Sequence, residues 1–416
     1  METSQPRIVL FDRKMKRNIF LLICCQAIGQ SANTMMFTAT ALSVVTFVAN
    51  HGLATLPVTM QHVGVMLSVF PAALLMQRMG RRFGFMAGSI FGMIGATICG
   101  LGLYLALLPL MCLGGVILGY AVANLQMYRF AAVELVPAAY RSKAISWVTA
   151  GGVAAGIIGP SVVEWSYDKL VPLYLATYAS MVGVHVTVFT IMSFIKFPPM
   201  QAPTAGASGM EAAHLPPRPL WQIATQPRFA ASVIAAMVAF GTMSFLMGAS
   251  PLAIVGCGLP HAEAHWVIFL HVMGMFVPSF YTGNLINRIG VLPVMALGTA
   301  ILLGGVMTAL HGIDAWNFRI ALMMNGIGWN FLFIGATSLV TTCYRPSERA
   351  KAQALNDFLV FGTTATASFL AGFLQDRLGW FPLNWASIAL IVVAGCAVFW
   401  LWVQQRQPAA VPLAGE

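Results

Sequence analysis

Amide side chains with helical spacing stand inside strongly apolar stretches of this 416-residue chain. Such groups are costly in an apolar segment unless they hydrogen-bond to a neighbouring helix or face a polar cavity, where they can bind a solute. In the first stretch, intervals of four, three and four residues place four side chains on one helix face: Gln26, Gln30, Asn33 and Phe37.

Two later apolar stretches repeat this combination of amide and aromatic residues. The first forms the stripe Tyr120, Asn124 and Tyr128, with Gln126 off the stripe, and the second, NGIGWNF, places Trp329 on the face of Asn325 with Asn330 beside it. The alternative for each residue is a hydrogen bond between helices without contact to any solute, which is common in membranes.

Titratable groups inside the apolar stretches are scarce. Asp357 is the one carboxylate well inside such a stretch, and it could carry a proton across a membrane or pair with Arg345 or Arg349 nearby. His271 and His185 can titrate near neutral pH, and the alternative for each is a hydrogen-bonded structural histidine.

The sequence around these side chains indicates a membrane protein. Hydrophobic residues make up 59% of the chain and charged residues 8%, whereas a soluble domain has about 25% charged residues. Such a chain cannot cover its surface with polar groups, so lipid must be its solvent. The first apolar run, residues 19–49, is too long for the apolar core of a cleavable signal peptide.

Twelve segments reach the length of about 20 predominantly apolar residues that a membrane-spanning helix needs. They predict an all-α integral membrane protein with twelve transmembrane helices in two six-helix halves. The spans are 19–48, 61–77, 84–107, 110–130, 143–163 and 172–195, followed by 229–256, 264–286, 291–311, 317–340, 352–374 and 382–403.

Basic residues concentrate on one side of this map. Only Lys169, Arg319 and Arg377 of the 22 lysines and arginines fall on the other side. By the positive-inside rule both termini are cytoplasmic, in what we expect to be the inner membrane of a bacterial cell. The net charge of +10 is therefore a topology signal that also favours lipid headgroups, and it does not indicate nucleic-acid binding. Arg129 and Glu134 are expected to pair at this cytoplasmic surface.

One long polar insertion divides the chain. It is rich in Pro, Ala and Gly and predicts a cytoplasmic linker with a short helix near residues 219–224. The expected organisation is a cytoplasmic segment 1–18, a six-helix bundle 19–195, the linker 196–228, a second bundle 229–403 and a cytoplasmic tail 404–416.

The sequence contains no motif of an enzyme or a metal site. Its seven cysteines are scattered without a CxxC pair, and HExxH, DxD and phosphate-binding glycine loops are absent. We therefore expect no catalytic residue, no metal and no cofactor.

Short polar hairpins interrupt the apolar sequence at equivalent places in the two halves. LLMQRMGRR (74–82) and GNLINRIGV (283–291) both follow the second helix of their half and share an x-Arg-x-Gly core. PAAYRSKAIS (137–146) and PSERAKAQAL (346–355) likewise lead into the fifth helix of each half. Two parallel six-helix repeats are the plan of one large class of secondary transporters.

These features resemble the major facilitator superfamily over about the whole chain, in helix number, linker position and loop motifs. The signature of that family between helices 2 and 3 is Gly-x-x-x-Asp-Arg-x-Gly-Arg-Arg/Lys. The matching positions here hold Ala73, Gln77, Arg78, Gly80, Arg81 and Arg82, and in the second copy Gly283, Asn287, Arg288 and Gly290.

Within this motif the glycines permit a tight turn, and the arginines can bridge to carboxylates and helix C-termini and so latch one face of the protein. The usual aspartate is an amide in both copies, Gln77 and Asn287, so we expect a weaker latch. The alternative is that these arginines only set the topology.

A glycine-rich segment in helix 5, GGVAAGIIGPSVVEW (151–165), matches in part a motif of drug–proton antiporters. Its small residues, with Gly159 and Pro160 at their end, predict close packing against helix 8 and a bend at the proline. This motif would serve an importer or an exporter, so it leaves the direction open.

The resemblance also implies a central cavity lined by helices 1, 4, 7 and 10, three of which carry the amide and aromatic stripes. The expected pocket is largely uncharged and suits a neutral or weakly polar small organic solute. It would be made by Gln26, Gln30, Asn33, Asn124, Tyr128, Asn325, Trp329 and Asn330. Asp357 and His271 are the candidates for proton coupling.

The function predicted from the sequence is a monomeric secondary transporter that moves a small organic solute by alternating access. The coupling ion and the direction remain open. The alternatives are a non-transporting membrane sensor or a membrane enzyme on the same scaffold, and a channel.

Overall fold

The computed structural model describes residues 12–137, 140–197, 218–345 and 348–406, and every regular element within these ranges is a helix. Eleven of the helices are long and apolar enough to cross a membrane, or twelve if the bent pair α10 and α11 forms one span. The membrane spans of the first half are α1 (Arg13–Val44), α2 (Leu56–Met79), α3 (Arg81–Tyr104), α4 (Leu108–Ala132), α5 (Arg141–Ser166) and α6 (Leu175–Ser193). Those of the second half are α9 (Pro227–Gly256), α10 (His261–Phe276), α11 (Ser279–Ile289), α12 (Val291–His311), α13 (Ala315–Val340), α14 (Arg349–Leu378) and α15 (Trp380–Arg406). The predicted all-α membrane fold is confirmed.

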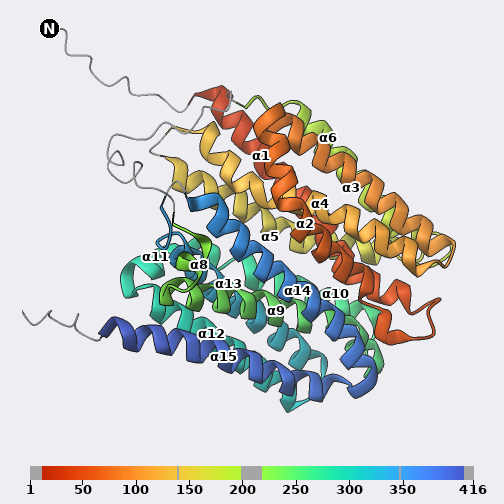
Figure 1. The fold of residues 1–416 in the computed structure, drawn as a ribbon. Coiled ribbons are helices and arrows are strands. Elements are labelled where there is room, and N and C mark those ends of the chain that lie inside the picture. The colour runs from red at the N-terminus through yellow and green to blue at the C-terminus, as the bar shows by residue number, and fades with distance from the viewer. Residues whose placement is uncertain (1–11, 138–139, 198–217, 346–347, 407–416) are drawn as a thin grey trace, which may run out of the picture.

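The helices form two bundles that lie side by side, α1–α6 and α9–α15 (Figure 1). The described start of α1 and the described end of α15 lie at the same end of the molecule, which we call the basic end because the arginine hairpins are there (Figure 1). The other end is called the opposite end. Helices α2 and α14 pack against each other across the boundary between the bundles.

Short helices add to the spans without crossing the membrane. These are η1 (His51–Leu53), η2 (Val133–Leu135) and α8 (Leu220–Ala224). The short helix expected near residues 219–224 is therefore confirmed as α8. Residues 198–217 of the predicted linker lie outside the described residues.

Each arginine hairpin turns on a glycine that ends one helix and begins the next. Gly80 has a φ of 87° between α2 and α3, and Gly290 has a φ of 92° between α11 and α12. An L side chain rarely adopts this region of backbone conformation, so glycine is required at both turns. The tight turns expected from the repeated motif are confirmed.

The first hairpin is held by an ion pair between Arg81 and Glu134. The Nη2 of Arg81 lies 2.7 Å from the carboxylate of Glu134, and its Nε donates to the same group at 3.2 Å. The expected pair of Glu134 with Arg129 is wrong. Positions five apart on a helix point about 140° away from each other, and Glu134 faces the hairpin. The remaining polar motif residues have exposed side chains: Gln77, Arg78, Arg82, Asn287 and Arg288.

The small residues of α5 pack against two different helices. A Cβ on Gly156 would meet Met273 and Val272 of α10, as expected for contact with helix 8. A Cβ on Gly159 would instead meet Thr34 of α1, so the expectation for this residue is corrected. The motif thus serves one contact between the halves and one within the first half, because α5 packs against both α10 and α1.

The eighth predicted span, residues 264–286, is not one continuous helix. It is broken into α10 and α11 with a bend of 40° at Val277 and Pro278. Proline has no backbone N–H and therefore interrupts the hydrogen-bond ladder of the helix.

Candidate solute-binding cavity

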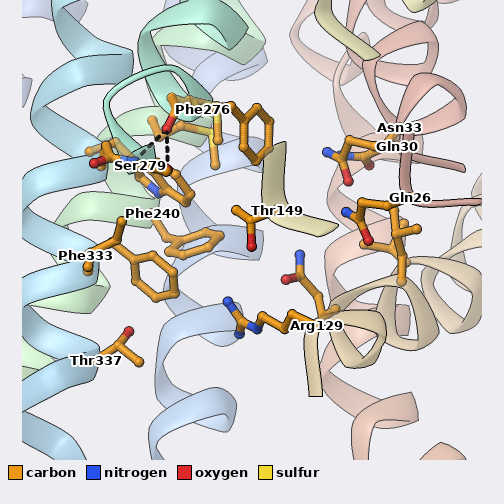
Figure 2. Close-up of a pocket in the computed structure, with 18 of the residues that line it drawn as sticks. Gln26, Gln30, Asn33, Arg129, Thr149, Phe240, Phe276, Ser279, Phe333 and Thr337 are labelled. Carbon is orange, nitrogen blue, oxygen red and sulfur yellow. Dashed lines mark hydrogen bonds between the residues drawn. The ribbon is translucent and has the colours of Figure 1, made fainter. Parts of the chain in front are cut away.

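A cavity of about 460 Å³ lies between the two bundles and is lined by residues from both (Figure 2). The first half contributes side chains from α1, α2, α4 and α5, and the second half contributes side chains from α9, α10, α11, α13 and α14. Its two faces differ in chemistry, and we call them the amide wall and the aromatic wall.

The amide wall belongs to the first half. Its members are five side-chain amides: Gln26, Gln30, Asn33, Gln61 and Gln126. Those on α1 follow the spacing that puts them on one helix face, and Figure 2 shows Gln26, Gln30 and Asn33 pointing into the same space. These three side chains make no hydrogen bond within the part of the chain that the structure describes. They are available to a solute.

The aromatic wall belongs to the second half and is a packed cluster of four rings: Phe240, Trp329, Phe333 and Phe361. The rings of Trp329 and Phe333 stack with centroids 5.1 Å apart and an angle of 22° between their planes. Phe240 meets both of them edge to face at 5.2 and 4.8 Å. This packing fixes the ring orientations and gives the cavity a rigid apolar face.

The cavity reaches the surface at the basic end. Its lining includes the exposed residues Ile145, at the start of α5, and Thr341, just after the end of α13. At the opposite end, hydrogen bonds cross between the halves: the hydroxyl of Thr55 donates to the carbonyl of Ser368 at 2.6 Å and accepts from the N–H of Gly372 at 3.2 Å. The structure is therefore open at the basic end and closed at the opposite end.

Five of the eight residues expected in the pocket line this cavity: Gln26, Gln30, Asn33, Trp329 and Asn330. Asn330 differs from the α1 amides because its hydrogen bonds are already made. Its Nδ2 donates to the carbonyl of Met275 and to the hydroxyl of Ser279, each at 2.6 Å, and its Oδ1 accepts from Thr282 at 2.6 Å. Asn330 thus stabilises the interruption between α10 and α11 through these hydrogen bonds.

The other three expected residues do not line this cavity, and their placement is corrected. Tyr128 is buried against Phe85 of α3, with ring centroids 4.7 Å apart. Asn124 donates to the carbonyl of Tyr120 at 2.9 Å and faces α3 beside Gly88. Asn325 is buried beside Gly305 of α12. On α4 one stripe of side chains packs within the bundle and another faces the cavity. Asn325 shares a face with Trp329 but lies one turn before the part of α13 that lines the cavity.

Sequence reasoning missed the residues on the second stripe of α4 and the polar residues of α2. Gln126 and Arg129 of α4 and Gln61 and His62 of α2 all line the cavity. The spacing of Val122, Gln126 and Arg129 is helical, so the signal was present in the sequence. What the sequence did not reveal is which stripe faces the other half.

The proton-coupling candidates occupy different surroundings. His271 is fully buried between α10 and α13, does not line the cavity, and donates from Nδ1 to the carbonyl of Leu322 at 2.8 Å. Asp357 accepts a hydrogen bond from the Nδ2 of Asn356 at 3.0 Å. Arg129 of the other half is one cation that acts electrostatically on Asp357.

Among the described residues, no group of three or more His, Cys, Asp or Glu side chains could hold a metal ion. What the cavity offers is hydrogen bonding, ring stacking and one cationic group, which is the chemistry of binding.

The model of the Major Facilitator Superfamily matches residues 19–260 and 232–416 of this chain. The riboflavin transporter RfnT of Brucella anthropi is 36% identical over 379 residues, which cover 91% of this chain and 94% of that protein. Two uncharacterized MFS-type transporters of Bacillus subtilis are also similar: YdeG, 26% identical over 89% of this chain and 88% of its own, and YddS, 23% identical over 95% and 93%.

These matches extend along the chain and agree with the helical architecture of the two bundles. They also bear out a transporter of a small organic solute rather than an enzyme. The chain belongs to the Major Facilitator Superfamily.

Proposed function

We propose that the protein carries a planar, uncharged aromatic heterocycle of the flavin type, with riboflavin as the first solute to test. The observation that carries this proposal is the pairing of an aromatic wall with a wall of unbonded amides across one cavity. A flat ring system can stack on Trp329 and Phe333 while its polar edge and its hydroxyl groups hydrogen-bond to Gln26, Gln30 and Asn33.

The relationship to the riboflavin transporter RfnT supports the same solute class, because the two chains align over nearly their whole lengths. A solute that lacks an extended ring system would leave the aromatic wall unused. Among the described side chains that line the cavity, a phosphate or a dication would find neither a basic cluster nor an acidic cluster.

The test is counterflow of labelled riboflavin in proteoliposomes that contain the full chain, with ribitol as a solute that has no ring. Trp329→Ala should weaken the apparent affinity for riboflavin by about 10-fold, since an aromatic contact contributes about 0.5–1.5 kcal/mol beyond its area. The matched control is Trp385→Ala on α15, whose side chain is 62% exposed on the outside of the bundle. Equal effects of the two substitutions, or no saturable riboflavin counterflow, would overturn the proposal.

The cellular setting is part of the proposal. We place the chain in the bacterial inner membrane as a monomer, surrounded by lipid, with both termini in the cytoplasm. The concentration of basic residues at one end supports this orientation, and the completion of the cavity by one chain supports the monomer. Labelling of a cysteine placed at Arg13 from each side of the membrane tests the orientation.

For coupling, we propose Asp357 as the group that carries a proton. Its support is its place about two turns into α14, under the influence of a cation from the other half. Flux stimulated by a pH gradient in the wild type and lost in Asp357→Asn would support this role, and unchanged stimulation would contradict it.

A further inference from the structure

The side chain of Arg129 enters the cavity from the last turn of α4. Figure 2 shows it extending from the side of the amide wall toward Phe333 and Thr337 on the other half. It stands at the cytoplasmic rim predicted from the sequence, yet it lines the same space as Gln126 and the aromatic wall. It is the one arginine or lysine among the described residues that line this cavity.

The hydrogen-bonding capacity of Arg129 is not used up by the protein. Its Nε is inaccessible and has no partner among the described residues. Its guanidinium carbon lies 5.0 Å from the ring centroid of Phe130, and the acidic residue next along the chain, Glu134, is occupied by Arg81. A cation with unused donors in a mostly apolar cavity is costly unless a ligand accepts from it.

We propose that Arg129 binds the acceptor edge of the transported ring system, where a carbonyl oxygen lies beside an unprotonated ring nitrogen. This inference rests on the proposed function, since it takes a flavin-type ring as the solute. The planar guanidinium presents two parallel N–H donors, which match two adjacent acceptors, here the carbonyl oxygen and the ring nitrogen, better than a lysine would. A ring stacked on the aromatic wall would turn its edge toward this guanidinium.

The experiment measures dissociation constants of the purified full chain by quenching of flavin fluorescence, with riboflavin, lumichrome and riboflavin 5′-phosphate as probes. Lumichrome keeps this acceptor edge and lacks the ribityl chain. Arg129→Gln should weaken binding of riboflavin and lumichrome by the same factor, about 10-fold or more, and Arg129→Lys should recover it in part. This magnitude corresponds to about 1.4 kcal/mol or more by the usual tenfold relation.

The matched control is Arg13→Gln, which removes an exposed arginine from the same end of the molecule and should leave binding unchanged. If Arg129→Gln weakens only the phosphorylated probe, the arginine binds a phosphate and the acceptor-edge assignment is overturned. If Arg129→Gln leaves the binding of riboflavin and lumichrome unchanged, Arg129 does not bind the ring and the assignment is overturned as well. If the wild type binds none of the three probes, the proposed function itself fails, a result distinct from normal binding by Arg129→Gln.

Discussion

The two asparagines Asn33 and Asn330 line one cavity but differ in the hydrogen bonds that their side chains make. The side chain of Asn33 makes no hydrogen bond within the described chain, while Asn330 makes three, all to the segment where α10 breaks into α11. A buried amide that bridges broken backbone stabilises the fold, whereas an unbonded amide facing a cavity can serve a solute. Residue type alone does not distinguish these roles.

This contrast makes a prediction at the scale of single residues. Asn330→Ala should lower the free energy of unfolding by about 1–3 kcal/mol, because interhelical hydrogen bonds in membranes contribute about 0.6–1.7 kcal/mol each. Asn33→Ala should leave the melting temperature in detergent unchanged and reduce riboflavin affinity. Thermal unfolding and flavin binding, measured on both variants, separate the two roles, and the reverse pattern would contradict the assignment.

At the scale of elements, one loop carries a buried carboxylate that organises its surroundings. Glu348, immediately before α14, accepts from the N–H of Arg218 at 2.8 Å, from the Nη2 of Arg218 at 2.7 Å and from the N–H of Arg345 at 2.9 Å. Arg218 also donates to the carbonyl of Cys343 at 3.1 Å. The described end of the linker is thereby tied to the loop between α13 and α14.

These hydrogen bonds, chiefly from the Arg218 side chain, lower the pKa of Glu348 from 4.5 to about 2. A carboxylate with a lowered folded-state pKa stabilises the protein at pH values above its unfolded pKa and loses this effect as the pH falls through the folded value. We predict that Glu348→Gln lowers unfolding stability by about 1.5–3 kcal/mol at neutral pH, the range for hydrogen bonds to charged groups. The difference from wild type should shrink below about pH 4.5 and vanish near pH 2.

Melting temperatures of both proteins across this pH range provide the measurement. The matched control is Glu164→Gln, at the end of α5, which removes an exposed carboxylate. A stability difference that stays constant from pH 7 to pH 2 would show that the charge of Glu348 contributes nothing.

At the scale of the whole molecule, two bundles share a cavity that is open at the basic end and sealed at the opposite end. The seal depends on few directional contacts, among them the hydroxyl of Thr55, which bonds to α14 at Ser368 and Gly372. Alternating access requires that such contacts break when the halves rock, so they must be individually weak.

Thr55→Val removes both hydrogen bonds and should shift the population toward the state open at the opposite end. A loss of about 1–2 kcal/mol changes such an equilibrium by about 5- to 30-fold. Spin labels at Lys169 and His311, exposed at that end in different halves, should report a longer distance. Thr187→Val is the control, since that hydroxyl bonds only to Gly183 of its own helix, and equal distances in both variants would contradict the seal.

Much of the architecture followed from the sequence because its physical causes are local. Lipid requires continuous apolar helices, so composition and span length predicted the helical membrane fold. The glycines of the two hairpins lie where the backbone needs a positive φ, and both turns were predicted at Gly80 and Gly290. The prediction that Gln26, Gln30 and Asn33 lie on one face of α1 was also correct, because helical spacing determines which side chains lie on the same face.

Tertiary structure decided the direction in which each face points. Helix α4 carries two stripes of polar residues, and their helical spacing does not tell which of them faces the cavity. Asn124 and Tyr128 pack against α3. Gln126 and Arg129 line the cavity. The partner of Glu134 was likewise fixed by a hairpin 53 residues away in the chain. Periodicity determines which residues lie together on a helix, but the rotation of that helix about its axis depends on every neighbour it packs against.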